Sequence, residues 1–350
     1  MWLMCDPPPS YRYSWTSLPE LVTCATCSHK LASWKEDWMA RKSVGGGQSK
    51  SAQEGAIAAA REVILKMKPK SKSEERRLAI QATPPAPKGK PTERGLGWNP
   101  QRPDHRDKVF PLLSLPMGLP KRYDMGPGMP PVYDQGRLGS CTANAATAAV
   151  QYTEQELTGK SRPSMSRLYT YYWTRFIEGH TGTDSGATIR DTFKSLNRYG
   201  YCFEKLWPYT NRFVDAPSVA AMAQADKHHL LTQVNYSSVP QQLGALRQVL
   251  AAGHPIVYGF TVYESFMSAQ VRTTGLVPLP GKHEKVLGGH AVCLVGYDDD
   301  AEDFIVRNSW GRSWGQDGYC RVPYAFILNQ GLCTDFWTVQ SVPAVAEETA

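Results

Sequence analysis

Three short motifs, far apart along the 350-residue chain, constrain its fold most strongly. They are QGRLGSC ending at Cys141, GGH ending at His290, and NSWGRSWG beginning at Asn308. A thiol attacks a carbonyl carbon as thiolate, which requires an imidazole to take the proton and a third group to orient the imidazole ring. We therefore expect a fold that brings Cys141, His290 and Asn308 together.

Gln135 completes this candidate set, six positions before the cysteine. Attack on a carbonyl creates an oxyanion that needs two hydrogen-bond donors, and the natural pair is the backbone N–H of Cys141 with the side-chain amide of Gln135. A lone cysteine is usually a small buried hydrophobe. The occurrence of all four residues in this order favours the catalytic interpretation.

The sequence around Cys141 predicts a helix that begins at the nucleophile. Gly139 and Ser140 form a turn with a capping hydroxyl, and TANAATAAVQY is a run of small residues with helical character. The partial positive charge of a helix N-terminus favours a thiolate in the first turn. Because the run is apolar nearly all round, we expect this helix to be buried.

His290 and Asn308 are expected on the two strands of one hairpin. The runs AVCLVGY and FIVRNSW are rich in β-branched residues and flank the acidic turn 298–303. An indole such as that of Trp310 would shield their contact from water. We interpret the acidic turn as a solvated loop, since it lacks the ligand spacing of a calcium loop; a cation site is the less favoured alternative.

Longer blocks of the chain resemble the papain-like cysteine peptidases. YDQGRLGSCTANA is similar to the family's nucleophile segment, GGHAVCLVGYD to its histidine strand, and RNSWGRSWGQDGYCRVPY to its asparagine strand. SRLYTYYWTRFIEG and CTDFWTV are similar to the bacterial, xylellain-like branch. The resemblance runs from Trp98 to Val339. Leu138 and Thr142 depart from the Cys-Gly-[Ser/Ala]-Cys-[Trp/Tyr] signature, so a disulfide common in plant and lysosomal members is expected to be absent.

The resemblance implies an α+β fold in which a helical subdomain and a β-barrel-like subdomain enclose the cleft. It implies hydrolysis of peptide bonds through a thioester on Cys141, with no cofactor and no metal. Gly186 would hold the main chain of an extended substrate, although it could simply end a loop before a helix. Gly289 would keep the rim of the cleft open, or serve only turn chemistry. Trp314 would line the leaving side of the site, or pack as ordinary core.

Charge and composition suggest four parts, with positive charge concentrated before the catalytic region. Residues 41–110 hold 16 Lys/Arg and 7 Asp/Glu, whereas the whole chain carries a net charge of +7. A Lys-, Pro- and Ser-rich stretch with few aromatic residues is typical of a solvated, disordered linker; weak binding of anionic partners is the less favoured alternative. We predict the following parts: an extension 1–93, a pre-catalytic segment 94–115, a peptidase domain 116–342 and a tail 343–350.

The N-terminal residues show neither a secretory signal nor a transmembrane helix, so a cytoplasmic location is the default expectation. Cys24 and Cys27, with His29 nearby, resemble half of a zinc knuckle, but no second ligand pair follows at a useful spacing. We expect no zinc site there, no disulfide framework among the eight cysteines, and a monomer that acts on proteins or peptides.

Two questions stay open at this point. Residues 94–107 immediately precede the catalytic region, and this Pro-rich block either covers the cleft as a pro-segment or braces the fold. The function has two alternatives to peptide hydrolysis: a catalytically silent relative that binds peptides, and a thiol amidase, transamidase or ligase. The presence of Gln135, Cys141, His290 and Asn308 together argues against the first. The NSWGRSWG motif argues against an amidase or a transamidase, whereas ligation through the same thioester stays open.

Overall fold

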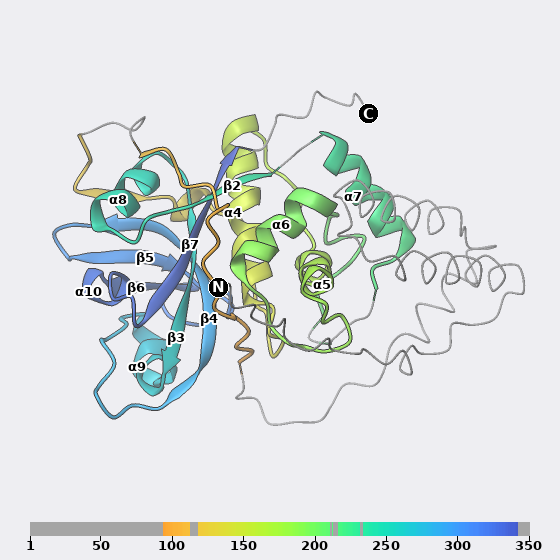
Figure 1. Cartoon of the computed structure of the whole chain (residues 1–350). Coiled ribbons are helices and arrows are strands. Elements are labelled where there is room, and N and C mark those ends of the chain that lie inside the picture. Colours follow the sequence, from red (N-terminus) through yellow and green to blue (C-terminus); the bar gives the residue numbers. More distant parts are fainter. Residues whose placement is uncertain (1–93, 113–117, 211, 213–215, 232–233, 342–350) are drawn as a thin grey trace, which may run out of the picture. The chain divides into compact units, whose positions relative to one another are not determined.

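Figure 1 shows the computed structural model of the protein, which describes residues 94–112, 118–210, 212, 216–231 and 234–341. The helices and helical turns in this part are η2 Gly126–Gly128, α4 Cys141–Thr158, α5 Arg167–Glu178, α6 Ile189–Tyr199, α7 Val219–Leu231, α8 Leu243–Ala251, η3 Glu264–Met267, α9 Ala269–Thr274 and α10 Tyr324–Ile327. The strands are β1 Arg122–Asp124, β2 Asn235–Ser238, β3 Ile256–Tyr263, β4 Val286–Asp298, β5 Asp303–Arg307, β6 Tyr319–Pro323 and β7 Cys333–Ser341.

Helix α4 is the buried central helix that the small-residue run predicts. Its first 14 residues are all buried. Polar residues are tolerated there because their side chains bond within the helix: the hydroxyls of Thr147 and Thr153 donate to the carbonyls four residues earlier, at 2.7 and 2.9 Å. The helix ends at Gly159, whose left-handed φ of 62° suits glycine. Helices α5 and α6 pack on α4 and complete the helical subdomain.

The capping hydroxyl predicted at Ser140 is wrong. Ser140 precedes α4, but its side chain makes no capping hydrogen bond to the helix backbone. Its hydroxyl instead lies 2.7 Å from the hydroxyl of Tyr209 and accepts a bond from the side-chain amide of Asn144. Tertiary partners therefore outcompete the local cap, and Cys141 still begins the helix.

The sheet subdomain is built from antiparallel strands in the order β2-β7-β3-β4-β5-β6, with β1 added beside β4. The predicted hairpin is β4 and β5, and its register pairs Cys293 with Arg307. His290 therefore lies on β4, while Asn308 directly follows the last residue of β5. The architecture is α+β with a helical and a sheet subdomain, as the resemblance implied (Figure 1).

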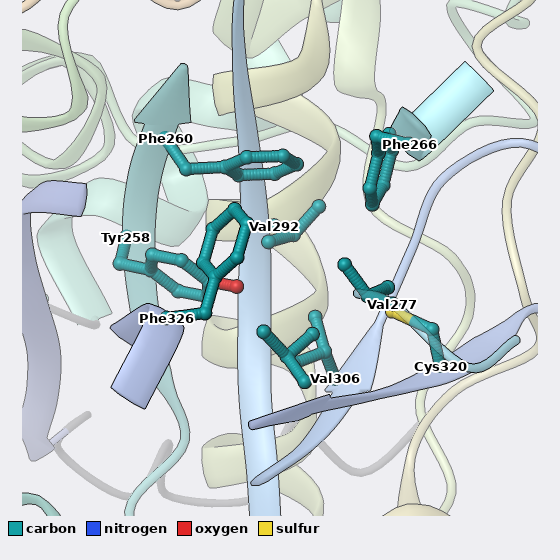
Figure 2. Close-up of a pocket in the computed structure, with 9 residues that line it drawn as sticks. Tyr258, Phe260, Phe266, Val277, Val292, Val306, Cys320 and Phe326 are labelled. Carbon is teal, nitrogen blue, oxygen red and sulfur yellow. The ribbon is translucent and has the colours of Figure 1, made fainter. Parts of the chain in front are cut away.

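An apolar core fills the side of β4 that faces away from α4 (Figure 2). Aromatic and branched side chains from β3, β4, β5 and β6 converge there with Phe326 of α10. Tyr258 stacks on Phe336 at a centroid distance of 5.3 Å. Because β4 packs on this core with one face and on α4 with the other, His290 is held on a strand that is fixed from both sides.

The prediction of a solvated loop holds for the exposed tip of the acidic turn, residues 300–302, but not for the carboxylates at its ends. Arg321 bonds Asp298 at 3.2 Å and Asp303 at 3.0 Å, and all three side chains are mostly buried. Arg247 pairs with Asp299. The carboxylates therefore tie the turn to β6 and α8. Their partners are distant in sequence, which is why the local pattern did not reveal them.

Candidate active site

Cys141 stands where the two subdomains meet. It is the first residue of α4, and its side chain is fully buried (0% exposed). Backbone N–H groups of Ala291, the residue after His290 on β4, and of Gly97 offset part of the rise that burial causes in the pKa of the thiol. The thiol therefore lies against the imidazole strand. The unpaired N–H groups of the first helical turn favour negative charge at this position.

His290 and Asn308 form a hydrogen-bonded pair whose protonation can be assigned. His290 Nε2 lies 2.8 Å from Asn308 Oδ1. That Asn308 atom also accepts the backbone N–H of Ser309 at 2.8 Å, so it is the amide oxygen and Nε2 must carry the proton. His290 Nδ1 is buried without a hydrogen-bond partner in the described part of the chain. Its lone pair is the free basic site of the ring.

Trp310 covers this pair as predicted. Its indole stacks on the imidazole of His290 with centroids 4.7 Å apart and ring planes at 26°. Trp314 packs edge-on against Trp310 at 5.5 Å and is 3% exposed. The structure therefore places Trp314 in the core of the sheet subdomain, the plainer of the two expectations for this residue.

Gln135 is held beside the nucleophile by Ser309. Its Oε1 accepts the Ser309 hydroxyl at 2.6 Å, which fixes the amide so that Nε2 is the donor end. Nε2 donates to the backbone carbonyls of Leu138 at 2.9 Å and Gly95 at 3.0 Å. The side-chain amide of Gln135, predicted as an oxyanion donor, therefore donates to two backbone carbonyls, one of them that of Gly95.

Residues 94–112, hereafter the covering segment, run between the two subdomains (Figure 1, orange). The backbone N–H of Ala187 donates to the carbonyl of Gly97 at 2.7 Å. The carbonyl of Ala187 in turn accepts the backbone N–H of Asn99 at 3.0 Å. Trp98 thereby forms a parallel bridge with Ala187, while its own N–H donates to the carbonyl of Gly289 at 3.1 Å. The segment fills the cleft as an added strand.

Gly186 and Gly289 make room for this strand. A Cβ on Gly186 would lie 2.3 Å from the carbonyl oxygen of Gly97, and one on Gly289 would lie 2.3 Å from that of Trp98. Gly186 also has a φ of 71°, a conformation that other residues rarely adopt. The structure places both predicted substrate-binding glycines against the main chain of an extended segment.

The indole of Trp98 anchors the covering segment. Trp98 is 5% exposed and packs on Gly259, where a Cβ would lie 2.0 Å from the ring. Its Nε1 donates to Asp335 Oδ2 at 3.1 Å, and the same oxygen accepts the backbone N–H of Gln101 at 3.0 Å. Asp335 lies within the CTDFWTV block, but its role could not be read from the sequence because its partners are more than 230 positions away.

Burial also affects the charge state of the site. Burial raises the pKa of Cys141 to about 11, although the backbone N–H groups of Ala291 and Gly97 lower it in part. Burial likewise lowers the pKa of His290 to about 4, partly offset by the bond to Asn308. In the covered form both groups are therefore neutral near pH 7. Water must reach the cleft before the thiolate–imidazolium pair becomes favourable.

This burial predicts that the covered form loses stability in acid. His290 titrates near its ordinary value of 6.5 in the unfolded chain and at about 4 when folded, so below pH 6.5 the unfolded state binds the extra proton. We expect the free energy of unfolding to fall by about 2 kcal/mol between about pH 7 and pH 5. Urea unfolding at both pH values measures it. His290→Gln should show a smaller loss, and identical losses in both proteins would contradict the assignment.

No group of three His, Cys, Asp or Glu side chains in the described ranges is placed to hold a metal ion. Cys24 and Cys27, the weak zinc candidates, lie outside these ranges, as do the predicted extension and tail. Within the same ranges, none of the helices combines the length and the apolar character needed to span a bilayer.

Cys141, the His290–Asn308 pair and Gln135 lie together between a helical and a sheet subdomain. This arrangement is typical of cysteine-dependent hydrolases whose cleft lies between two subdomains. The chain belongs to the papain family of cysteine proteases: the model described as "Papain family cysteine protease" matches residues 119–335, more than half of its length.

Individual relatives agree with this family. The chain is 40% identical over 250 residues to an uncharacterized peptidase C1-like protein of Acanthamoeba polyphaga mimivirus, covering 69% of this chain and 77% of that protein. Xylellain, a cysteine protease from Xylella fastidiosa, is 38% identical with a TM-score of 0.65, covering 73% of this chain and 99% of xylellain. Digestive procathepsin L 3 of Tenebrio molitor larval midgut shares the fold at 20% identity and a TM-score of 0.54, covering 71% of this chain and 76% of that chain. The resemblance to the xylellain branch is confirmed.

The cysteines lead to a prediction about redox conditions. The described cysteines are all buried and free: Cys141, Cys202, Cys293, Cys320 and Cys333. We expect a reductant to leave the thermal unfolding temperature unchanged, since no disulfide would be lost, and to maintain activity by keeping Cys141 reduced. Thermal unfolding and peptide hydrolysis with and without reductant test this. A drop of several degrees on reduction would reveal a structural disulfide.

Proposed function

We propose that this protein is a cysteine endopeptidase that hydrolyses peptide bonds through a thioester on Cys141. The observation that carries the proposal is the meeting of Cys141 on α4 with the His290–Asn308 pair and the Gln135 amide across one cleft. Protein or peptide substrates follow from the family, and the extended main chain already seated in this cleft supports them. We expect the enzyme to act as a monomer.

The geometry supports a definite division of roles. His290 Nδ1, the free basic nitrogen, takes the proton of Cys141, and the resulting imidazolium keeps its Nε2–H on Asn308 Oδ1. The thiolate adds to the substrate carbonyl, and Gln135 Nε2 with the Cys141 N–H stabilises the oxyanion. His290 then gives its proton to the leaving amine. Water, activated by the same imidazole, hydrolyses the thioester and releases the acid.

We further propose that the covering segment keeps the enzyme latent. The Gly95 carbonyl accepts from the Gln135 amide, the Gly97 N–H acts on the pKa of the Cys141 thiol, and the Trp98 N–H donates to the Gly289 carbonyl. A substrate needs each of these positions. Bracing of the fold is the alternative role, and it does not require contacts at these positions.

The two other function classes fit these contacts less well. A silent peptide-binding relative has no need for an imidazole whose basic nitrogen is kept free next to a thiol. A thiol ligase or transamidase would use the same thioester but would need an amine in place of water. Product analysis distinguishes it, because hydrolysis releases a free carboxylate at the cut bond.

Intact-mass analysis with an epoxysuccinyl thiol reagent tests the proposed function. The full chain is treated before and after limited proteolysis that removes the covering segment, and the modified residue is mapped. We expect a single adduct on Cys141 after proteolysis, together with hydrolysis of a denatured protein substrate. Failure of both reactions in the trimmed protein would refute the proposed peptidase.

A further inference from the structure

Two loops that must cooperate in the proposed reaction lie unusually close together. The nucleophile loop, residues 136–140, leads into Cys141, and the substrate-binding loop, residues 180–187, ends in the Gly186 turn. A Cβ on Gly139 would lie 3.3 Å from the Asp184 carboxylate and 3.4 Å from the Cα of Gly186. The spacing of these loops sets how far a peptide held at Gly186 and Ala187 lies from the thiol.

A carboxylate connects the two loops. Both oxygens of Asp184 accept the backbone N–H of Gly139, each at 3.1 Å. The hydroxyl of Tyr171 donates to Asp184 Oδ1 and accepts the backbone N–H of Gly186 at 3.1 Å. One carboxylate and one hydroxyl thus link the nucleophile loop, helix α5 and the substrate-binding loop in a continuous chain of hydrogen bonds.

Helix α5 gives this connection a rigid base. Tyr171 is 1% exposed, and the guanidinium of Arg175, one turn later, lies 4.3 Å from the centre of its ring. Arg175 also donates to the carbonyls of Thr181 and Thr183, at 3.1 and 2.8 Å. Burial raises the pKa of Tyr171, so its hydroxyl stays protonated and remains a donor. Two buried side chains of α5 therefore hold the substrate-binding loop.

We infer that Asp184 and Tyr171 are positioning residues of the proposed peptidase, which hold the nucleophile loop and the substrate-binding loop at the distance that thiol attack requires. The inference rests on the proposed function. The residues touch no reacting atom, and they act through Gly139 and Gly186.

The connection predicts a graded set of effects on trimmed, active protein. Asp184→Ala leaves the Gly139 N–H without its acceptor, and we expect kcat/KM for an extended peptide to fall about tenfold to hundredfold. Asp184→Asn keeps a carbonyl oxygen for that N–H and should recover most of the loss. Tyr171→Phe frees the Gly186 N–H and should raise KM for extended peptides more than it lowers kcat. Asp300→Ala, at an exposed carboxylate paired with Lys121, is the matched control and should equal the wild type.

Two measurements separate positioning from general damage. Iodoacetamide is too small to reach Gly186, so Tyr171→Phe should leave its rate of reaction with Cys141 nearly unchanged while peptide hydrolysis falls. Hydrogen exchange of the Gly139 amide in the full chain needs no activity, and it should be faster in Asp184→Ala than in wild type or Asp300→Ala. If Asp184→Ala unfolds, Tyr171→Phe carries the comparison, with lower kcat/KM for extended peptides than wild type and a nearly unchanged rate of iodoacetamide labelling.

These experiments distinguish failure of the positioning role from failure of the proposed peptidase function. Wild-type kcat/KM in Asp184→Ala would overturn the inference, and so would unchanged exchange at Gly139. If the wild type and Asp300→Ala hydrolyse no peptide even after trimming, the peptidase proposal fails, and exchange at Gly139 alone then decides whether Asp184 holds the loop.

Discussion

Cys141→Ala and His290→Ala should each abolish peptide hydrolysis. The first removes the sulfur that forms the thioester. The second removes the base that we propose takes its proton, since His290 Nδ1 is the ring nitrogen that Asn308 leaves free. Loss of the nucleophile or base from such a set costs on the order of 10⁶-fold in rate. Initial rates on a fluorogenic peptide, measured on trimmed protein, provide the test.

Gln135→Ala and Asn308→Ala should lower the rate without abolishing it. Removal of one oxyanion donor typically costs about a hundredfold, and Asn308 orients an imidazole that Trp310 still covers. Cys202→Ala is the matched control, because Cys202 is equally buried but lies outside the site. Full turnover in a folded Cys141→Ser variant would rule out the proposed mechanism.

Local patterns in the sequence were sufficient to predict the elements that carry the chemistry. The small-residue run predicts α4 with Cys141 at its start, and the two β-branched runs predict the β4–β5 hairpin. Both predictions depend only on residues that are near one another in sequence. The helix is predicted by its small side chains, and the strands by their runs of β-branched residues. The longer blocks around Cys141, His290 and Asn308 then resembled one family, and that resemblance implied the two-subdomain fold.

Partners from distant parts of the chain could not be predicted in this way. Ser140 is a residue type that commonly caps a helix, yet its hydroxyl forms a hydrogen bond with that of Tyr209, 69 positions away. The acidic turn looks solvated until Arg321 is placed beside it by the pairing of β5 with β6. Asp184 stands in a sequence that already suggested a substrate-binding turn, but its bond to Gly139 spans 45 positions. Each of these contacts is created by tertiary packing rather than by local propensity.

Trp98→Ala should release the covering segment and expose the thiol. The substitution removes a side chain that is 5% exposed, together with its bond to Asp335, while leaving the catalytic residues intact. Burial of such an indole is worth about 3 kcal/mol or more. Since 1.4 kcal/mol corresponds to a factor of ten, the open population, and with it the labelling rate of Cys141, should rise on the order of 100-fold.

The full chain is the right protein for this measurement, with Arg106→Ala as the control in the same segment. The side chain of Arg106 is 79% exposed and pairs only with Asp104 in the described part of the chain, so its loss should leave labelling unchanged. A latent enzyme shows faster labelling and faster peptide hydrolysis in Trp98→Ala, and limited proteolysis adds little further. A brace instead shows a lower unfolding temperature in Trp98→Ala, with labelling no faster than in the wild type. The bonds of Gly95 to the Gln135 amide and of Trp98 to the Gly289 carbonyl favour the first result, because a substrate that uses Gln135 and Gly289 as proposed must displace the segment before it can react.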